Sequence, residues 1–222
     1  MTFFNDTKIT YADKSDKDLI RAYLLFRIIS SPIITKILTT LLRIANNLHL
    51  PIKNIIKTTI YKQFCGGTSI KESQSTINKL WESQIGTILN FSAEGKENEA
   101  DFKRTEAEII ATIKTANKSE KVPFAVFKPT AITSFSLLEK MSRKKTLTNI
   151  EQEEKIKFES RINKICKTAY ELKVPIFIDA EESWIQNTID ELVEDMMKTY
   201  NNIGILLAIR FCRFSSKTYC KT

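Results

Sequence analysis

The sequence predicts an α/β protein in which buried parallel strands alternate with helices, preceded by an N-terminal helical region. Three observations predict this class. Helical periodicity runs with few breaks through residues 18–61. Short, almost continuously apolar segments follow at 122–127 and 174–178, as is typical of parallel strands that are buried on both faces. Amphipathic helical segments separate these strands, and parallel strands need such crossover connections.

The N-terminal region, residues 1–66, is predicted to contain three helices. Ser15 or Asp16 is expected to cap the first helix near Asp18, because short side-chain oxygens accept hydrogen bonds from the free N–H groups of a first turn. Pro51 is expected in the first turn of the third helix, where the missing N–H of proline leaves no hydrogen bond unmade.

The most apolar early segment is residues 19–44, which basic side chains and Pro32 interrupt. No window in it reaches the ~18 uninterrupted apolar residues that a membrane span requires. Two amphipathic helices that meet near Pro32 explain this segment better. Such helices either pack on a protein core or lie on a membrane surface.

The second region, residues 67–200, is predicted to alternate strands with helices. Strands are expected at 86–92, 122–127 and 174–178. One helix is expected to begin at residue 68 or 69, and further helices are expected at 98–118, 134–141, 151–172 and 181–200. Glu181 and Glu182 would then form an acidic first turn that suits the positive end of a helix dipole. A closed (β/α)₈ barrel needs ~200 to 250 residues, more than follow Gly86, so we expect an open sheet with unpaired edges and poor solubility.

The last region, residues 201–222, differs in composition from the rest of the chain. Residues 203–209 are predicted to form a fourth strand. Residues 210–222 are basic, lack acidic side chains and contain two of the four cysteines. Translation in a shifted reading frame produces such an abrupt change, and a natural basic tail is the alternative.

Composition excludes several kinds of chemistry. The chain has 34 basic and 26 acidic residues, a net charge of +8, and the charges are interspersed as on solvated helix faces, which disfavours a nucleic-acid partner. Its four cysteines form no C-x-x-C pair, and His49 is the single histidine, so neither a zinc site nor a histidine-activated nucleophile is expected. We therefore expect no bound metal ion. We also expect the cysteines to be free thiols, as they are in the reducing cytoplasm.

Candidate site residues follow the predicted strands, because ligands of parallel α/β folds bind at the carboxyl ends of the strands. Lys128 follows the second strand, and Asp179 follows the third. A lysine there binds a carboxylate or phosphate, or forms a Schiff base, unless it is simply solvated. Asp179 either belongs to the site or caps the next helix. Together they predict a pocket for a small zwitterion. Hydride transfer and aldol chemistry are both compatible with these two residues.

Four segments occur in a characteristic order: FCGG at 64–67, GTILNFSAEG at 86–95, FKPTAI at 127–132 and VPIFIDAEES at 174–183. The last of these is the most specific. Their succession, over about residues 15 to 200, resembles the N-terminal portion of the proline dehydrogenase family, in particular its FAD-dependent, stand-alone members.

The resemblance implies a distorted (β/α)₈-type barrel, here partial, that binds FAD and oxidises L-proline to Δ1-pyrroline-5-carboxylate by hydride transfer in proline catabolism. It implies that Lys128 binds the substrate carboxylate, that Asp179 is catalytic and lies beside the flavin, and that Ala180 contacts FAD through its backbone. It also implies that a quinone accepts the electrons and that the protein, otherwise cytoplasmic, is peripheral at the inner membrane.

Other family features have no counterpart among these residues. Later strands of the family supply a glutamine and an arginine to the flavin, and its last helix supplies an arginine pair to the substrate carboxylate. Arg210 and Arg213 lie in the tail and are assigned no role. We therefore expect a truncated barrel that is inactive by itself. A lysine-dependent aldolase-type enzyme using Lys128 and a non-catalytic helical interaction module on residues 18–65 are the alternatives.

Overall fold

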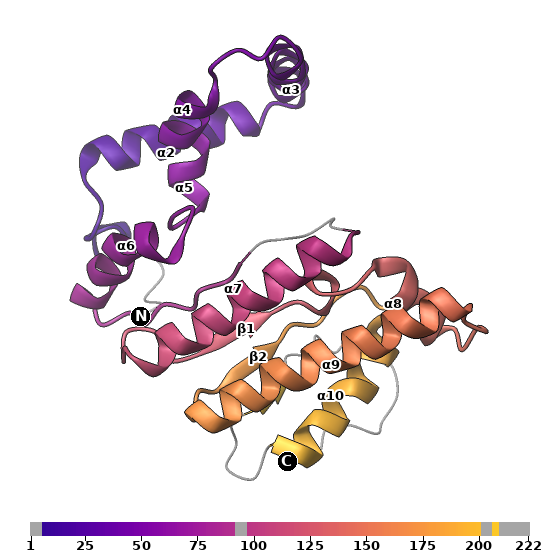
Figure 1. Cartoon of the computed structure of the whole chain (residues 1–222). Helices are drawn as coiled ribbons and strands as arrows, with labels where there is room; N and C mark the ends of the chain where they lie inside the picture. Colours follow the sequence, from indigo (N-terminus) through magenta and orange to yellow (C-terminus); the bar gives the residue numbers. More distant parts are fainter. Residues whose placement is uncertain (1–5, 92–96, 201–205, 209–222) are drawn as a thin grey trace. The chain divides into compact units, whose positions relative to one another are not determined.

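The computed structural model describes residues 6–91, 97–200 and 206–208, and it divides into two compact units, residues 1–79 and 80–222 (Figure 1). The division falls within helix α6 (Ile70–Glu82), and the domain boundary after residue 66 stays a prediction. The start of α6 is bonded to the segment before it: Lys57 Nζ lies 2.9 Å from Glu72 Oε1, and Thr76 Oγ1 donates to the Gly66 carbonyl at 3.0 Å. These bonds place the first turns of α6 with the N-terminal helices.

The regular elements among the described residues of the first unit are all helices, joined by turns. It contains α1 (Thr7–Thr10), α2 (Asp16–Ile29), α3 (Pro32–Asn47), α4 (Lys53–Ile56), a π-helical segment (Lys57–Tyr61) and α5 (Lys62–Phe64). Ser15 caps α2, since its hydroxyl accepts from the Asp18 N–H, and Ser31 caps α3 ahead of Pro32. The two predicted helices that meet near Pro32 are therefore confirmed.

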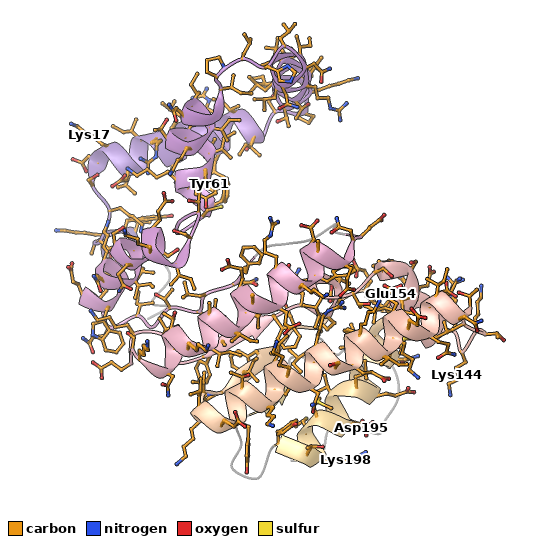
Figure 2. The ribbon with its side chains drawn as sticks, viewed as in Figure 1. Lys17, Tyr61, Lys144, Glu154, Asp195 and Lys198 are labelled. Carbon is orange, nitrogen blue, oxygen red and sulfur yellow. The ribbon has the colours of Figure 1, made fainter. Side chains whose placement is uncertain are left out.

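The third predicted helix begins later than expected. The Ile52 N–H donates to the Leu50 carbonyl at 2.8 Å, which forms a tight turn around Pro51 and delays α4 until Lys53. The prediction of a first-turn proline is thus wrong. Beyond α4 the chain continues through the π-helical segment, at whose end Tyr61 lies (Figure 2). The Tyr61 hydroxyl donates to the Gly67 carbonyl.

None of the described residues before Ser73 is buried, which is unusual for helices with so many apolar side chains. Across the described part of the chain, no single helix has the length and hydropathy of a membrane span. Helices α2 and α3 reach that length and hydropathy only as a pair, with a bend of 95° between them.

The second unit alternates helices with parallel strands, as predicted. It contains α7 (Glu99–Asn117), β1 (Ala125–Phe127), a 3-10 turn (Pro129–Ala131), α8 (Phe135–Ser142), α9 (Asn149–Leu172), β2 (Ile176–Ile178), α10 (Gln186–Tyr200) and β3 (Leu206–Ala208). The strands form a parallel sheet in the order β1-β2-β3, which confirms the α/β class without showing a complete barrel. Leu206–Ala208 is part of the predicted fourth strand, whose other residues lie outside the described ones.

The predicted strand at 86–92 is reduced to one bridge. Leu89 pairs in parallel with Ala125, and the Thr87 N–H donates to the Lys121 carbonyl at 2.8 Å. Residues 86–91 therefore run beside β1 without forming a regular strand, and Ser92 lies outside the described residues.

One face of the sheet carries the core. Ala125 and Phe127 of β1, with Ile176 and Ile178 of β2, are almost fully buried, whereas Val126 and Phe177 between them are only partly buried. The buried face packs against apolar residues of α7, α9 and α10: Ile109, Ile113, Phe158, Ile162, Ile165, Ile189 and Val193. Each such side chain contributes about 1.5 to 3 kcal/mol through burial. Because side chains alternate along a strand, Val126 and Phe177 belong to the opposite face, which lacks this core.

Helix α10 begins at Gln186 and not at residue 181, and no acidic residue lies in its first turn. The turn before it is closed by the Glu182 carbonyl, which accepts from the N–H groups of Ile185 and Gln186 at 3.0 and 3.1 Å. The prediction that Glu181 and Glu182 form an acidic first turn is therefore wrong.

Candidate functional site at the carboxyl edge of the sheet

Lys128 and Asp179 leave the sheet at the same edge. Phe127 is paired with Ile178 in the parallel register of β1 and β2, so the next residue of each strand is Lys128 or Asp179. The Asp179 N–H donates to the Phe127 carbonyl at 3.0 Å, which extends the pairing to this edge. The parallel register therefore brings Lys128 and Asp179 to one edge, as predicted, because neighbouring parallel strands end on the same side of a sheet.

Both residues belong to the face of the sheet that lacks the helical core. A strand repeats every two residues, so Lys128 follows Val126 and Asp179 follows Phe177 on that face. Lys128 and Asp179 are each partly buried. Phe124 stacks on Phe177 with ring centroids 4.8 Å apart, which gives this face an aromatic, apolar surface.

The loops that follow β1 and β2 are bonded to each other through Glu181. Its carboxylate accepts a hydrogen bond from the Thr130 N–H at 2.8 Å and a second one from the Thr130 hydroxyl. The Glu181 N–H in turn donates to Gln186 Oε1 at 2.9 Å, at the start of α10. Glu181 therefore fixes the 3-10 turn directly after Lys128 to the segment directly after Asp179.

Burial raises the pKa of Glu181, although the hydrogen bonds from Thr130 and the positive charge of Lys128 both act to lower it. Glu181 was not predicted as a site residue, because a place in the first turn of a helix already accounted for its negative charge. Its position just beyond Asp179, at the carboxyl edge, was the available signal.

Ala180 lies between Asp179 and Glu181 and is partly buried. Its contact with FAD stays a prediction. The neighbouring groups fit a flavin in kind, because flavin-like ligands bind to apolar and aromatic surface bordered by a few polar groups. Here Val126, Phe124 and Phe177 supply that surface, and the polar groups follow at the carboxyl edge.

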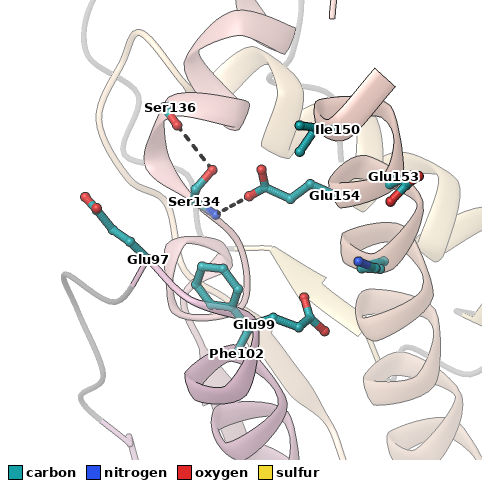
Figure 3. Close-up of a pocket in the computed structure, with 9 residues that line it drawn as sticks. Glu97, Glu99, Phe102, Ser134, Ser136, Ile150, Glu153 and Glu154 are labelled. Carbon is teal, nitrogen blue, oxygen red and sulfur yellow. Dashed lines mark hydrogen bonds between the residues drawn. The ribbon is translucent and has the colours of Figure 1, made fainter. Parts of the chain in front are cut away.

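A cavity of about 390 Å³ lies elsewhere, at the first turns of α7, α8 and α9 (Figure 3). Its lining includes four glutamates, Glu97, Glu99, Glu153 and Glu154, and neither Lys128 nor Asp179. Glu154 Oε1 accepts from the Ser134 N–H at 3.1 Å, so this carboxylate supports the start of α8. An acidic lining repels carboxylate ligands, so the cavity is a poor candidate for an amino-acid substrate.

Beside this cavity, a buried arginine supports the loop after the 3-10 turn. Arg161 of α9 is only 4% exposed. It donates to the Ile132 carbonyl at 2.8 Å, pairs with Glu99 and lies over the Phe102 ring, 5.4 Å from its centroid. The arginine therefore connects α7, α9 and the segment that follows Lys128.

The thiols offer no second site among the described residues. Cys65 is exposed, and burial raises the pKa of Cys166 to about 12, so its thiol stays protonated and unreactive. Neither forms a disulfide. Within the described ranges, no three His, Cys, Asp or Glu residues converge as metal ligands do. Cys212 and Cys220 lie outside the described residues.

Several known proteins are similar in sequence to this chain. The proline dehydrogenase family pattern matches residues 73–209, more than half of the chain. Carbapenem antibiotics biosynthesis protein CarD of Pectobacterium carotovorum subsp. carotovorum is 26% identical over 146 residues, which cover 66% of this chain and 39% of that protein. Mitochondrial proline dehydrogenase 1 of Dictyostelium discoideum is 26% identical over 235 residues, covering 88% of this chain and 41% of that protein.

A solved structure shows the same fold. Proline utilization A of Bdellovibrio bacteriovorus, inactivated by N-propargylglycine, superimposes with a TM-score of 0.51 at 16% identity, over 66% of this chain and 16% of that one. The chain spans about two fifths of the length of the curated relatives it matches. The family match includes both strand ends that carry Lys128 and Asp179, and it continues through β3. This chain belongs to the proline dehydrogenase family.

Proposed function

We propose that this chain carries the proline-binding edge of an FAD-dependent proline dehydrogenase, which oxidises L-proline to Δ1-pyrroline-5-carboxylate. The observation that supports this most strongly is the parallel register of β1 and β2, in which Lys128 and Asp179 follow Phe127 and Ile178 at one edge. A cation and a carboxylate at one edge complement the two charges of a zwitterionic amino acid.

Each residue has a distinct part in this proposal. The Lys128 ammonium binds the proline carboxylate as a compact charge with three donors. Asp179 accepts a hydrogen bond from the proline nitrogen and orients the ring. Ala180 contacts FAD through its backbone, and Phe124 and Phe177 supply apolar surface. FAD, when bound, takes up the hydride that leaves proline.

Glu181 acts on this site through the backbone. Its two hydrogen bonds from Thr130 hold the turn that follows Lys128, so the lysine approaches the substrate from a fixed position. Pre-positioned charges stabilise a bound ligand without the cost of ordering a flexible loop.

A quinone is the proposed acceptor of the electrons, and the proposed location is cytoplasmic, with a peripheral place at the inner membrane where a lipid-soluble acceptor is found. The two alternatives, an aldolase-type enzyme using Lys128 and a non-catalytic helical module, are not favoured. The family match covers residues 73–209 and includes the edge residues that a helical module would not use.

The test is calorimetric titration of L-proline onto the full chain in the presence of FAD, which measures substrate binding without requiring turnover. Lys128→Ala should weaken L-proline binding about 10- to 100-fold, because a hydrogen bond to a charged group contributes about 1.5 to 3 kcal/mol. Lys128→Arg should retain part of the affinity. Lys167→Ala, at an exposed lysine of α9, should change nothing. Absence of L-proline binding by the unmodified chain, or equal binding by Lys128→Ala, would refute the proposal.

A further inference from the structure

One segment of the N-terminal region carries basic side chains and no acidic ones. Residues 19–71 contain no Asp or Glu, and their charged side chains are Arg21, Arg27, Lys36, Arg43, Lys53, Lys57, Lys62 and Lys71. Residues 196–222 are a second such segment, with no acidic residue and with Lys198, Arg210, Arg213, Lys217 and Lys221. Charge of one sign that is gathered in a single segment is attracted to an oppositely charged partner, unlike charges spread over a solvated surface.

The same segment exposes most of its apolar side chains. None of the described residues of α2 and α3 is buried. Ile33 is 74% exposed and Leu48 is 66% exposed, and Ile37, Leu41 and Ile44 between them are also exposed. Their spacings of three and four residues place them along one stripe of α3. On α2, Ile20, Tyr23, Leu24 and Phe26 are exposed as well. Soluble surfaces rarely carry a continuous apolar area of this kind.

Helix α3 separates its charge from this stripe. Lys36 and Arg43 are seven residues apart, so they lie almost on one line of the helix, beside the stripe and next to Thr39 and Asn47. The described residues supply no carboxylate to Lys36 or Arg43, in contrast to Lys57, which pairs with Glu72. An apolar face bordered by lysine and arginine is the arrangement of helices that lie in the plane of a membrane surface.

We propose that α2 and α3 form a docking surface for an anionic phospholipid bilayer. The apolar stripe would enter the boundary between headgroups and acyl chains, and Arg27, Lys36 and Arg43 would contact the lipid phosphates. Charge complementarity selects this occupant, because an anionic bilayer presents negative charge and apolar depth over a broad surface. The 95° bend between the helices and the cations within them favour a position on the surface over a span.

The proposal extends the peripheral location suggested above to a named surface. Its evidence lies wholly in residues 19–71, and it does not require proline oxidation. Both the observation and the test are therefore independent of FAD, Lys128 and Asp179.

The test is flotation of the full chain with vesicles on a density gradient, without FAD or proline. Flotation separates membrane binding from aggregation, because aggregated protein does not rise with lipid. The chain should float with vesicles of phosphatidylglycerol and phosphatidylcholine, but not with phosphatidylcholine alone. Raising the salt from about 0.1 to about 1 M, which shortens the Debye length from ~10 to ~3 Å, should release it.

Two pairs of substitutions sharpen the result. Lys36→Gln with Arg43→Gln should weaken binding to the anionic vesicles roughly 30-fold, at about fivefold for each cation removed. Both side chains are exposed, so circular dichroism should show unchanged helix content. Lys103→Gln with Lys167→Gln removes the same charge from exposed positions of α7 and α9 and should leave binding unchanged.

Several outcomes would overturn the proposal. They are equal flotation with neutral vesicles, equal weakening by both pairs of substitutions, and no flotation of the unmodified chain. A chain that remains with the dense fraction and forms dimers in light scattering would assign the apolar stripe to a second copy instead.

Discussion

Glu181 accepts hydrogen bonds from both the backbone N–H, at 2.8 Å, and the hydroxyl of Thr130, although the two residues are 51 positions apart. This pair connects the loops that follow the two neighbouring parallel strands. It lies next to Lys128 and Asp179, so a change in the protonation of Glu181 is felt at the candidate site.

Glu181→Gln should make the stability of the chain less dependent on pH above 4.5. Burial raises the pKa of Glu181 in the folded state above the ordinary value of 4.5. The stabilising contribution of its protonated form is complete below 4.5 and is lost as the pH rises through the raised pKa. Thermal unfolding followed by circular dichroism from pH 4.5 to neutrality measures this slope. Glu120→Gln, at an exposed residue that does not act on Glu181, should keep the original slope.

Glu151→Gln should make the chain less sensitive to acid in a lower pH range. Hydrogen bonds from the Lys140 ammonium and the Thr148 backbone lower the pKa of Glu151 from 4.5 to about 2. Its stabilising contribution is therefore present above 4.5 and is lost as the pH falls towards 2. Acid unfolding of the parent chain should be steeper than that of the variant. The exposed Glu153→Gln is the control, and an equal effect of both variants would contradict this account.

Thr148→Ala should destabilise α9 by about 0.5 to 2 kcal/mol, the usual effect of losing an N-cap side chain. The Thr148 hydroxyl accepts from the Glu151 N–H, and the Glu151 carboxylate accepts from the Thr148 N–H at 2.9 Å, so the two residues form a capping box. Urea unfolding measures the loss. Thr148→Ser should retain most of the stability, because serine preserves the acceptor, and an equal loss in both variants would contradict the role of the cap.

Gly67→Ala should disrupt the start of α6, whereas Gly66→Ala should be nearly neutral. A Cβ atom at Gly67 would lie 2.6 Å from the Ser73 backbone nitrogen, whereas one at Gly66 would have no neighbour closer than 3.9 Å. Overpacking of this kind costs about 1 to 3 kcal/mol. Amide hydrogen exchange of α6 should be faster only in Gly67→Ala. Similar exchange in the two variants would show that the turn can relax.

Arg161→Ala should lower the unfolding free energy by about 3 kcal/mol. The substitution leaves the buried Ile132 carbonyl without its charged donor and removes the partner of Glu99. Urea unfolding checks this value. Arg104→Ala, which removes an exposed arginine of α7, should change stability by less than about 0.5 kcal/mol. A small effect of Arg161→Ala would mean that Lys157 or water replaces the guanidinium.

Local patterns in the sequence predicted most of the second unit. The apolar residues of α9, such as Ile162 and Ile165, are buried as their spacing indicates. The strands at 125–127 and 176–178 lie within the predicted segments. Lys128 and Asp179 were predicted at one edge because crossover connections through helices make successive strands parallel. This inference requires no knowledge of individual contacts.

Only the tertiary structure decided where α10 begins and what Glu181 does. The sequence around Glu181 and Glu182 is compatible with a helical first turn, but Thr130 supplies two donors from a distant segment, and the helix begins at Gln186. The unit boundary within α6 likewise depends on Lys57 and Glu72, which are not neighbours along the chain. Periodicity records which face of an element is buried. It does not record which polar group on another element will bond to a given side chain, because that depends on the fold as a whole.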